Sequence, residues 1–346
     1  MARLIDIADR VGVSHATVSR ILSGKQNAPP QVRQKVLRVA KELGYRSVQA
    51  TAAAGAIESQ CVIELVMCNL SRKNEGLPGG FQMQVVRGIQ EVAEDETGVT
   101  CRVTYVEDTD GKDALFAKLE QADGVILLGN SERDMVEELL RRKVRVVLAD
   151  HHHEGLGVDC VVSDNISGGR CAAQYLLERG FRRIGWLGGP GHVSAWNERL
   201  AGVRLELLNA GIQIADKDLR SVREVTPEAF EEAAEKWVAE GDLPEAIITP
   251  TSLSVLMVQH VLARHGLQMP ADVSLVSFDD DALSAICRPI PTRVATRPLE
   301  IGRKAMQRVL QLRSQKGWLG SHHKVVVPVK LIEGDSVSHC EQKAMQ

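Results

Sequence analysis

The feature that most constrains the fold of this chain is a repeated alternation of short, continuous apolar runs with longer amphipathic stretches. The first series of runs is CVIELVMC, CRVTYV, GVILLG and VRVVLA, with helices expected over residues 82–96, 112–121 and 132–142. The second series is CVVS, RIGWLG, AIITP and VSLVSF, with helices expected over 168–179, 198–209 and 253–264. Continuous apolar runs are typical of strands buried on both faces, so the pattern predicts an α/β fold of parallel sheets flanked by helices. Two doubly wound units in tandem place the carboxyl ends of their strands, and therefore a ligand crevice, at the junction.

The N-terminal residues follow a different pattern. Apolar residues recur at helical spacing as Ile5, Ala8 and Val11, and then as Val18, Ile21 and Leu22. Gly12 permits a chain reversal between the two stretches, and Ser14 is a good N-cap for the second. A third helix is expected over about residues 30–43. Two short helices joined by a tight glycine turn form a helix-turn-helix, although an ordinary corner between two helices of a larger core has the same pattern.

Charge segregation favours the first of these interpretations. Residues 1–46 carry nine Lys or Arg against three Asp or Glu, a net charge of +6. The remaining 300 residues carry 33 basic and 42 acidic side chains, a net charge of −9. A basic N-terminal domain on an acidic body suits phosphate neutralisation and steers the protein towards nucleic acid.

The second helix also presents side chains that suit DNA. The candidate contact residues are Ser14, His15, Ala16, Thr17, Ser19 and Arg20. Arg20 has the chemistry to bind guanine O6 and N7, and Ala16 to touch a thymine methyl. The hydroxyls of Ser14, Thr17 and Ser19 suit phosphate oxygens, which position a helix without reading sequence. The N-terminal half of such a helix enters the major groove.

These motifs carry a family resemblance. IADRVGVSHATVSRILSGK and VRQKVLRVAKELGYR resemble the DNA-binding headpiece of the lactose-repressor family of bacterial transcriptional regulators. VVSDNISGGRCAAQYLLERGFRRIGWLGG, ERLAG and MPADVSLVSFDDDAL resemble the sensor domain of the same family, which is similar in fold to periplasmic sugar-binding proteins. SAWNER and VVVPVKLIE resemble, more weakly, its xylose-regulator branch. The resemblance covers residues 3–334 and implies DNA-reading roles for His15, Ala16 and Arg20.

The resemblance also implies a domain organisation. We expect a headpiece at residues 1–46, a linker at 47–60, an effector-binding and dimerisation domain at 61–334, and a disordered tail at 335–346. Lobe 1 would comprise about 61–162 plus 292–323, and lobe 2 about 163–291 plus 324–334. The family places a groove-wedging Leu in the linker, and this chain has Ala54 there, so we expect little bending of the DNA.

Effector-binding candidates follow the strand ends and the resemblance. They are Phe81, Asp150, Trp196, Arg199, Thr251, Ser252 and Asp279. Asp150 and Asp279 end strands, where carboxylates can accept hydrogen bonds from sugar hydroxyls; capping of the next helix is the alternative for Asp279. Arg199 matches a family arginine that holds effector oxygens; an ordinary surface arginine is the alternative. Many family members have Asn-Asp where this chain has Thr251-Ser252. The resemblance therefore does not by itself imply that this chain binds a free hexose.

Other chemical signals are weak. Seven scattered cysteines have no metal-ligand spacing and are typical of free thiols in a reducing cytosol. Adjacent residues of the His151–Glu154 run cannot all face one ion, and LGGPGH is a poor match to a dinucleotide fingerprint. We therefore expect no metal, no cofactor and no catalytic residues. No charged start followed by an apolar run marks a signal peptide, and no apolar run approaches membrane-spanning length, so we expect neither feature.

The sequence thus predicts a sequence-specific regulator, most simply a repressor of carbohydrate-utilisation genes. Its partners would be a pseudo-palindromic double-stranded operator, a sugar or sugar derivative, and a second copy of the chain in a homodimer or a tetramer. It would act in the bacterial cytoplasm, associated with the nucleoid. A cytosolic sugar-binding enzyme that uses the cleft between the lobes is the alternative, but it leaves the basic headpiece unexplained.

Overall fold

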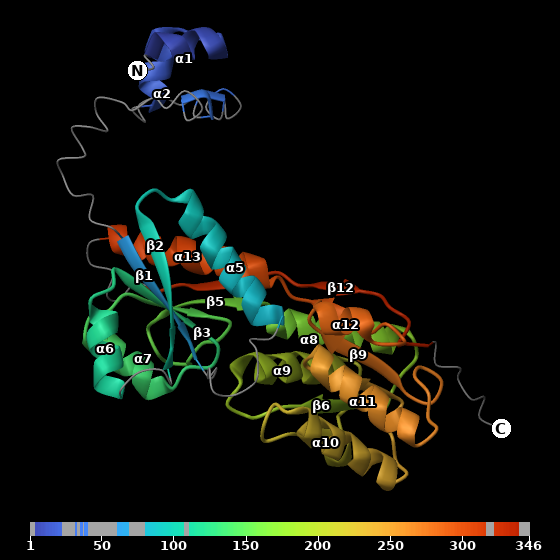
Figure 1. Cartoon of the computed structure of the whole chain (residues 1–346). Coiled ribbons are helices and arrows are strands. Elements are labelled where there is room, and N and C mark those ends of the chain that lie inside the picture. Colours follow the sequence, from blue (N-terminus) through green and yellow to red (C-terminus); the bar gives the residue numbers. More distant parts are fainter. Residues whose placement is uncertain are drawn as a thin grey trace. The chain divides into compact units, whose positions relative to one another are not determined.

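A computed structural model describes residues 4–22, 32, 35–36, 38–40, 61–68, 80–106, 111–315 and 322–338. The chain divides into two compact units, Met1–Gln60 and Cys61–Gln346 (Figure 1). The linker at 47–60, with Ala54, and the loop at 69–79 lie outside the described residues. We describe each unit by itself.

The first unit contains two short helices around a small core. Helix α1 (Leu4–Val11) and helix α2 (His15–Leu22) pack against each other. Gly12 has a φ of 79°, the left-handed conformation that the expected reversal needs. The Ser14 hydroxyl accepts a hydrogen bond from the Thr17 amide (3.1 Å), which confirms its expected role as N-cap of α2. The described residues of the expected third helix (32, 35–36 and 38–40) are helical.

The buried face of α1 differs by one position from the expected stripe. Ile7, Ala8 and Val11 are buried, whereas Ile5 is 50% exposed. Ile7 and Val11 are four residues apart and lie on one helix face, which Ile5 does not share with them. They pack with Val18, Ile21, Val36, Val39 and Ala40. The helix-turn-helix therefore buries its own compact core.

Lobe 1 of the second unit is a six-stranded parallel sheet in the order β11-β5-β4-β3-β1-β2. Its strands are β1 (Cys61–Met67), β2 (Val99–Tyr105), β3 (Gly124–Leu128), β4 (Val146–Ala149), β5 (Asp159–Ser163) and β11 (Lys324–Val327). Helices α5 (Gly80–Asp95) and α13 (Pro298–Ser314) cover one face. Helices α6 (Lys112–Glu120) and α7 (Arg133–Arg141) cover the other (Figure 1).

Lobe 2 repeats this plan in the order β12-β10-β9-β8-β6-β7, with only the β10–β12 pair antiparallel among the described strands. Its strands are β6 (Ile184–Gly188), β7 (Leu219–Ser221), β8 (Ala246–Ile248), β9 (Ser274–Phe278), β10 (Thr292–Ala295) and β12 (Lys330–Ile332). Helices α8 (Asn165–Glu178) and α9 (Ser194–Asn209) cover one face, and α10 (Pro227–Ala239) and α11 (Ser252–Arg264) the other. The short helix α12 (Ala282–Ile286) follows β9.

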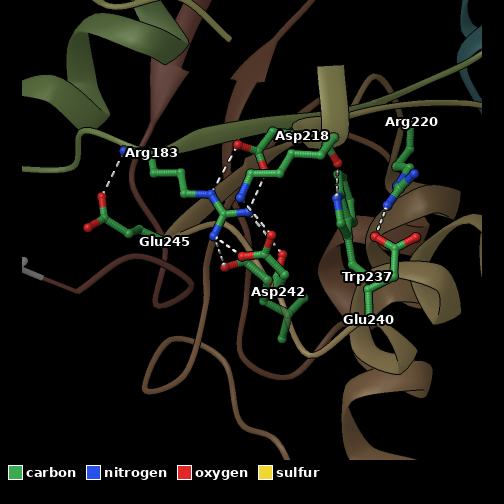
Figure 2. Close-up of polar contacts among 9 residues, drawn as sticks. Arg183, Asp218, Arg220, Trp237, Glu240, Asp242 and Glu245 are labelled. Carbon is green, nitrogen blue, oxygen red and sulfur yellow. Dashed lines mark hydrogen bonds and ion pairs between the residues drawn. The ribbon is translucent and has the colours of Figure 1, made fainter. Parts of the chain in front are cut away.

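The amino-terminal ends of β6 and β7 are tied together by an arginine. The Arg183 guanidinium donates hydrogen bonds to both carboxylate oxygens of Asp218 (2.7 and 3.0 Å) and also contacts Asp242. Glu245 accepts from the Arg183 backbone amide (2.8 Å), and Figure 2 shows these groups converging. This polar cluster lies at the strand ends opposite to those that carry the site described below.

The strand pairing corrects the expected lobe boundaries. The change of lobe after Ser163 agrees with the structure, because β5 belongs to lobe 1 and β6 to lobe 2. Residues 292–295 form β10 in lobe 2, and residues 324–327 form β11 in lobe 1, the reverse of our expectation. The chain therefore changes lobe after β10 and after β11 rather than before them.

The expected disorder of the tail is wrong for residues 335–338. The Ser336 side chain is fully buried, and its hydroxyl accepts from the Thr292 amide (2.8 Å) and donates to the Leu275 carbonyl (2.6 Å). The Ser336 carbonyl oxygen also accepts from the Leu275 amide of β9 (2.9 Å), and the Asp335 amide donates to the Ile290 carbonyl oxygen (2.7 Å). These backbone bonds near the start of β9 order the polar segment. Residues 339–346 lie outside the described part of the chain.

Paired glycines allow close helix contact in both lobes. A Cβ on Gly202 of α9 would lie 2.1 Å from the Ile166 carbonyl oxygen, and one on Gly169 of α8 would lie 2.0 Å from the Arg199 carbonyl oxygen. In lobe 1, Gly88 of α5 and Gly302 of α13 allow the same close contact. A Cβ on Gly88 would lie 2.1 Å from the Leu299 carbonyl oxygen, and one on Gly302 would lie 2.0 Å from the Val85 carbonyl oxygen. The α8–α9 contact fixes the backbone that carries Arg199.

We predict that Gly202→Ala lowers the free energy of unfolding by about 1–3 kcal/mol, because the added methyl group forces the two helix backbones apart. Gly191→Ala is the control, since its Cβ would meet nothing within 4 Å. Urea denaturation of both variants checks this. Equal stability of the two variants would contradict the close-contact interpretation.

Candidate functional site

Arg199 lies at the centre of the polar groups on the carboxyl ends of the lobe 2 strands. It is 3% exposed, so the alternative of a surface arginine is wrong. Its Nε donates to Asn165 Oδ1 (3.0 Å), and its Nη1 donates to the Pro250 carbonyl oxygen (2.6 Å). The guanidinium stacks over the Phe278 ring at 4.4 Å, and Nη2 lies 3.7 Å from Asp279 Oδ1. Residues from α8, α9, β9 and the loop after β8 therefore meet at one cation.

Two aspartates occupy matching places in the two lobes. Asp150 follows β4 and Asp279 follows β9, and each of these strands is third in the order of its sheet. Both aspartates have a positive φ, 67° and 73°. This conformation is unfavourable for a residue with a side chain, and such strain concentrates at functional sites.

Burial and neighbouring charges act together on Asp150. Burial raises the pKa of this carboxyl group to about 7; Arg199 opposes the rise, and Asp279 and Glu198 add to it. The atom Oδ1 is buried and has no hydrogen-bond partner within the described part of the chain. Asp150 of lobe 1 therefore interacts electrostatically with Arg199 and Asp279 of lobe 2. Its Oδ1 can still accept a hydrogen bond.

Asp279 is held in the site and does not cap the next helix. The Thr296 hydroxyl donates to its Oδ1 (3.1 Å), and burial raises its pKa against the opposing effect of Arg199. The cap of α12 is Asp281, whose Oδ1 accepts from the Ser284 amide (3.0 Å). The capping alternative is therefore wrong for Asp279.

Glu198 joins the two lobes beside Arg199, and the sequence pattern did not reveal it. Its carboxylate accepts from Lys324 Nζ (2.7 Å) of β11 and from Asn165 Nδ2 (3.0 Å) of α8, and it lies 2.7 Å from His152 Nε2 after β4. Burial raises the pKa of Glu198, but these hydrogen bonds outweigh it and leave the pKa below its ordinary value. The sequence signal for Glu198 is only that it is a charged residue directly before Arg199.

The other effector candidates divide into two groups. Ser252 is 1% exposed, and its buried hydroxyl has no hydrogen-bond partner among the described residues. Thr251 instead caps α11, accepting from the Ser254 amide (3.3 Å). Phe81 is half-buried and packs against the lobe 1 core, and Trp196 packs near Phe230 with ring centroids 6.4 Å apart. The structure thus brings Asp150, Arg199 and Asp279 together, and not all seven candidates.

The candidate DNA-contact residues lie on and just before α2. Ser14 and His15 are exposed, and Thr17 and Ser19 are partly exposed. The Ser14 and Thr17 hydroxyls lie 2.7 Å apart and hydrogen-bond to each other, so each has less capacity left for phosphate. The side chains of Ala16 and Arg20 lie outside the described part of the structure.

The histidine run has a structural explanation. His151 is 2% exposed, and burial lowers its pKa to about 3, so the ring is neutral. Its Nδ1 donates to the Ala149 carbonyl oxygen (3.2 Å), which leaves Nε2 to accept from the Ser131 hydroxyl (2.6 Å). Among the described residues, no group of three or more His, Cys, Asp or Glu could hold a metal ion. No helix of the described chain has the length and apolar character to cross a membrane.

These features define a class: a helix-turn-helix unit joined to a two-lobed ligand-binding domain. Residues 3–47 match the bacterial regulatory proteins of the lacI family, and residues 173–337 match the periplasmic binding protein-like domain. The regulator CelR of Thermobifida fusca is 30% identical over 310 residues, covering 88% of this chain and 89% of that protein. Catabolite control protein A of Priestia megaterium is 28% identical over 315 residues, which cover 88% of this chain and 90% of that protein.

Solved structures agree with this assignment. The structure of a transcriptional regulator CelR–cellobiose complex superimposes with a TM-score of 0.71 at 26% identity, covering 97% of this chain and all of that one. The protein belongs to the lacI family of bacterial regulatory proteins. It is a DNA-binding transcriptional regulator and not an enzyme. The weaker likeness to the xylose-regulator branch stays a prediction.

The raised pKa of Asp150 predicts how stability depends on pH. Between the ordinary value of 3.8 and about 7, the folded state keeps a proton that the unfolded state releases. The free energy of unfolding therefore falls as pH rises through this window, by roughly 4 kcal/mol at most for this group. Asp150→Asn lacks the titrating group, so its stability relative to the wild type should improve as pH rises from 5 to 7.5. Urea denaturation at a series of pH values measures this, and parallel pH curves for the two proteins would contradict it.

Proposed function

We propose that this regulator is a repressor of carbohydrate-utilisation genes, and that its DNA binding is controlled by a sugar or sugar derivative bound between the lobes. The observation that carries the proposal is the convergence of Arg199, Asp150 and Asp279 at the facing strand ends. Two strained carboxylates and a buried guanidinium suit the hydroxyls of a sugar, which both donate and accept hydrogen bonds. The cellobiose bound by CelR supports this class of ligand.

Control of DNA binding would follow from the site bridging two lobes. A sugar that contacts Asp150 in lobe 1 and Arg199 in lobe 2 stabilises the arrangement in which both contacts exist. Because a ligand shifts an equilibrium only through its different affinities for the two states, this shared contact supplies the required difference. Glu198 provides a ligand-independent link between the same lobes through Lys324.

DNA recognition would use α2 in the major groove. His15, Ala16 and Arg20 would read base edges, while Ser14, Thr17 and Ser19 would contact phosphates. One such helix reads only a half-site, so a homodimer on a pseudo-palindromic operator is the simplest complex. The protein would act in the cytoplasm, associated with the nucleoid.

The effector proposal is tested with Arg199→Met and the matched variant Arg170→Met. Arg170 lies on α8 and forms a surface pair with Glu206 (2.9 Å). A thermal-shift screen of sugars and sugar phosphates first selects a ligand, and calorimetry then measures its affinity for each variant. Arg199→Met should cost about 2–5 kcal/mol of binding free energy, because it removes the buried cation that would hydrogen-bond the sugar. Arg170→Met should bind normally, and DNA affinity without ligand should persist in both; undiminished sugar binding by Arg199→Met would overturn the proposal.

The DNA proposal is tested with Arg20→Ala on operators that are selected from genomic fragments and then mutated at each base pair. Loss of a guanine contact should remove about 1–3 kcal/mol of discrimination at one position of each half-site. Arg141→Ala, in the other unit and with a 70% exposed side chain, is the charge-matched control and should change nothing. Equal weakening at every position by Arg20→Ala would identify a phosphate contact instead.

A further inference from the structure

A pocket in lobe 1 lies against α6 and α7, which Figure 1 shows beside each other. It has a volume of about 220 Å³. Its lining includes Cys68, Leu115, Phe116, Asn130, Ser131 and Met135. None of the seven effector candidates lines it, and neither DNA binding nor the Arg199 site gives a reason for it.

The size and the apolar walls of this pocket suit one aromatic ring. An apolar cavity of about 150 Å³ is large enough for benzene. The 220 Å³ of this pocket therefore holds a single ring with a short substituent. Phe116 of α6 supplies a phenyl ring and Met135 of α7 a thioether, and both groups make favourable contacts with aromatic rings.

The charged side chains that line the pocket are mainly acidic. They are Glu132, Asp134 and Glu138, against one lysine, Lys112. Lys112 Nζ pairs with Glu132 Oε2 (3.0 Å), and Glu138 pairs with Arg142. Asp134 is exposed and forms no ion pair with the described residues. The pocket therefore favours a ligand that carries a positive charge at one end.

One wall of the pocket connects with the effector site. The hydroxyl of Ser131 donates to His151 Nε2 (2.6 Å), and His151 Nδ1 donates to the Ala149 carbonyl oxygen (3.2 Å). Ala149 and His151 are the two chain neighbours of Asp150, which has a φ of 67°. A ligand that displaces Ser131 therefore alters the contacts that hold the backbone of Asp150.

We propose that this pocket is a second ligand site, for an aromatic amine with one ring, and that its occupancy changes the affinity of the Arg199 site for its effector. The ring packs against Phe116 and Met135, and the ammonium group pairs with Asp134. His151 is the positioning residue between the two sites. The coupling rests on the proposed sugar control, whereas binding of the amine does not.

The binding test uses calorimetry on the full-length protein with phenethylamine. Three comparison compounds each lack one feature: 2-phenylethanol has no charge, phenylacetate has the opposite charge, and ethylamine has no ring. Met135→Trp fills the pocket, and Leu205→Trp, at a 43% exposed position of α9, is its control. Asp134→Asn removes the unpaired charge. Asp113→Asn is its control, because Asp113 is also exposed in the first turn of a helix but does not line the pocket.

Phenethylamine should bind about two- to fivefold more tightly than 2-phenylethanol, the usual effect of an exposed ion pair. Ethylamine should not bind. Met135→Trp should weaken phenethylamine about tenfold or more, because the indole occupies the space for the ring. Asp134→Asn should remove only the preference for the amine, and both controls should bind as the wild type does.

Two results would overturn the amine site. One is phenylacetate binding as tightly as phenethylamine. The other is equal binding of phenethylamine by Met135→Trp and Leu205→Trp. Thermal unfolding shows whether Met135→Trp is folded; Asp134→Asn, a surface change, carries the test if it is not. Either result leaves sugar control standing.

The coupling test measures the affinity of the sugar selected by the thermal-shift screen, with and without saturating phenethylamine. The affinity should change about fivefold or more, and the sugar should change phenethylamine affinity by the same factor. His151→Phe keeps a ring but loses both hydrogen bonds, so it should bind phenethylamine normally and lose the coupling. An unchanged sugar affinity in the wild type, or full coupling in His151→Phe, would overturn the connection between the sites. If no sugar binds, sugar control and the coupling both fall, and the amine site is judged by phenethylamine alone.

Discussion

The buried guanidinium of Arg199 is the interaction on which the ligand-binding domain depends. Burying a cation is unfavourable unless its donors and its charge are matched, and removing one partner of such a group costs several kcal/mol. Here the partners are the Asn165 side chain, the Pro250 carbonyl, the Phe278 ring and Asp279. They come from separate elements of lobe 2, so one side chain holds the carboxyl ends of that lobe in a fixed arrangement.

The two lobes share two structural features, one at a strand end and one between a pair of helices. Each has a left-handed aspartate after its third strand, Asp150 or Asp279. Each also has a helix pair in close contact through two glycines, Gly88 with Gly302 and Gly169 with Gly202. Equivalent strand ends therefore face one another with like charges, and Arg199 supplies the opposite charge between them. Asp150 Oδ1 has no hydrogen-bond partner in the described part of the structure, so it is available to accept a hydrogen bond from a ligand.

Much of this architecture is predictable from local sequence pattern. Continuous apolar runs such as GVILL and SLVSF identify buried parallel strands, because no water-facing residue interrupts them. The residue after such a run lies at the carboxyl edge of the sheet, and this predicts the positions of Asp150 and Asp279. Ser14 was predictable because capping depends on neighbours in the chain.

Features that depend on tertiary pairing were not predictable. The strands TRVA and KVVV look alike locally, and only their partners, β9 and β5, decide which lobe each joins. Thr251 looks like a ligand group until its hydroxyl is seen to cap α11. Glu198 has an ordinary helical context, and its role appears only when Lys324, 126 residues later, lies 2.7 Å from it. Ser336 belongs to a polar tail, yet its hydrogen bonds to Leu275 of β9 and Thr292 of β10 accompany complete burial.

The most direct test of the account is hydrogen exchange of the full-length protein with and without the sugar selected by the thermal-shift screen. If the ligand joins the two lobes through Arg199, slowed exchange should appear at the carboxyl strand ends of both lobes. The relevant segments are 149–153 in lobe 1 and 189–199, 249–252 and 279–281 in lobe 2. Protection confined to one lobe, or located away from these strand ends, would contradict the claim that the effector bridges the lobes at this charged site.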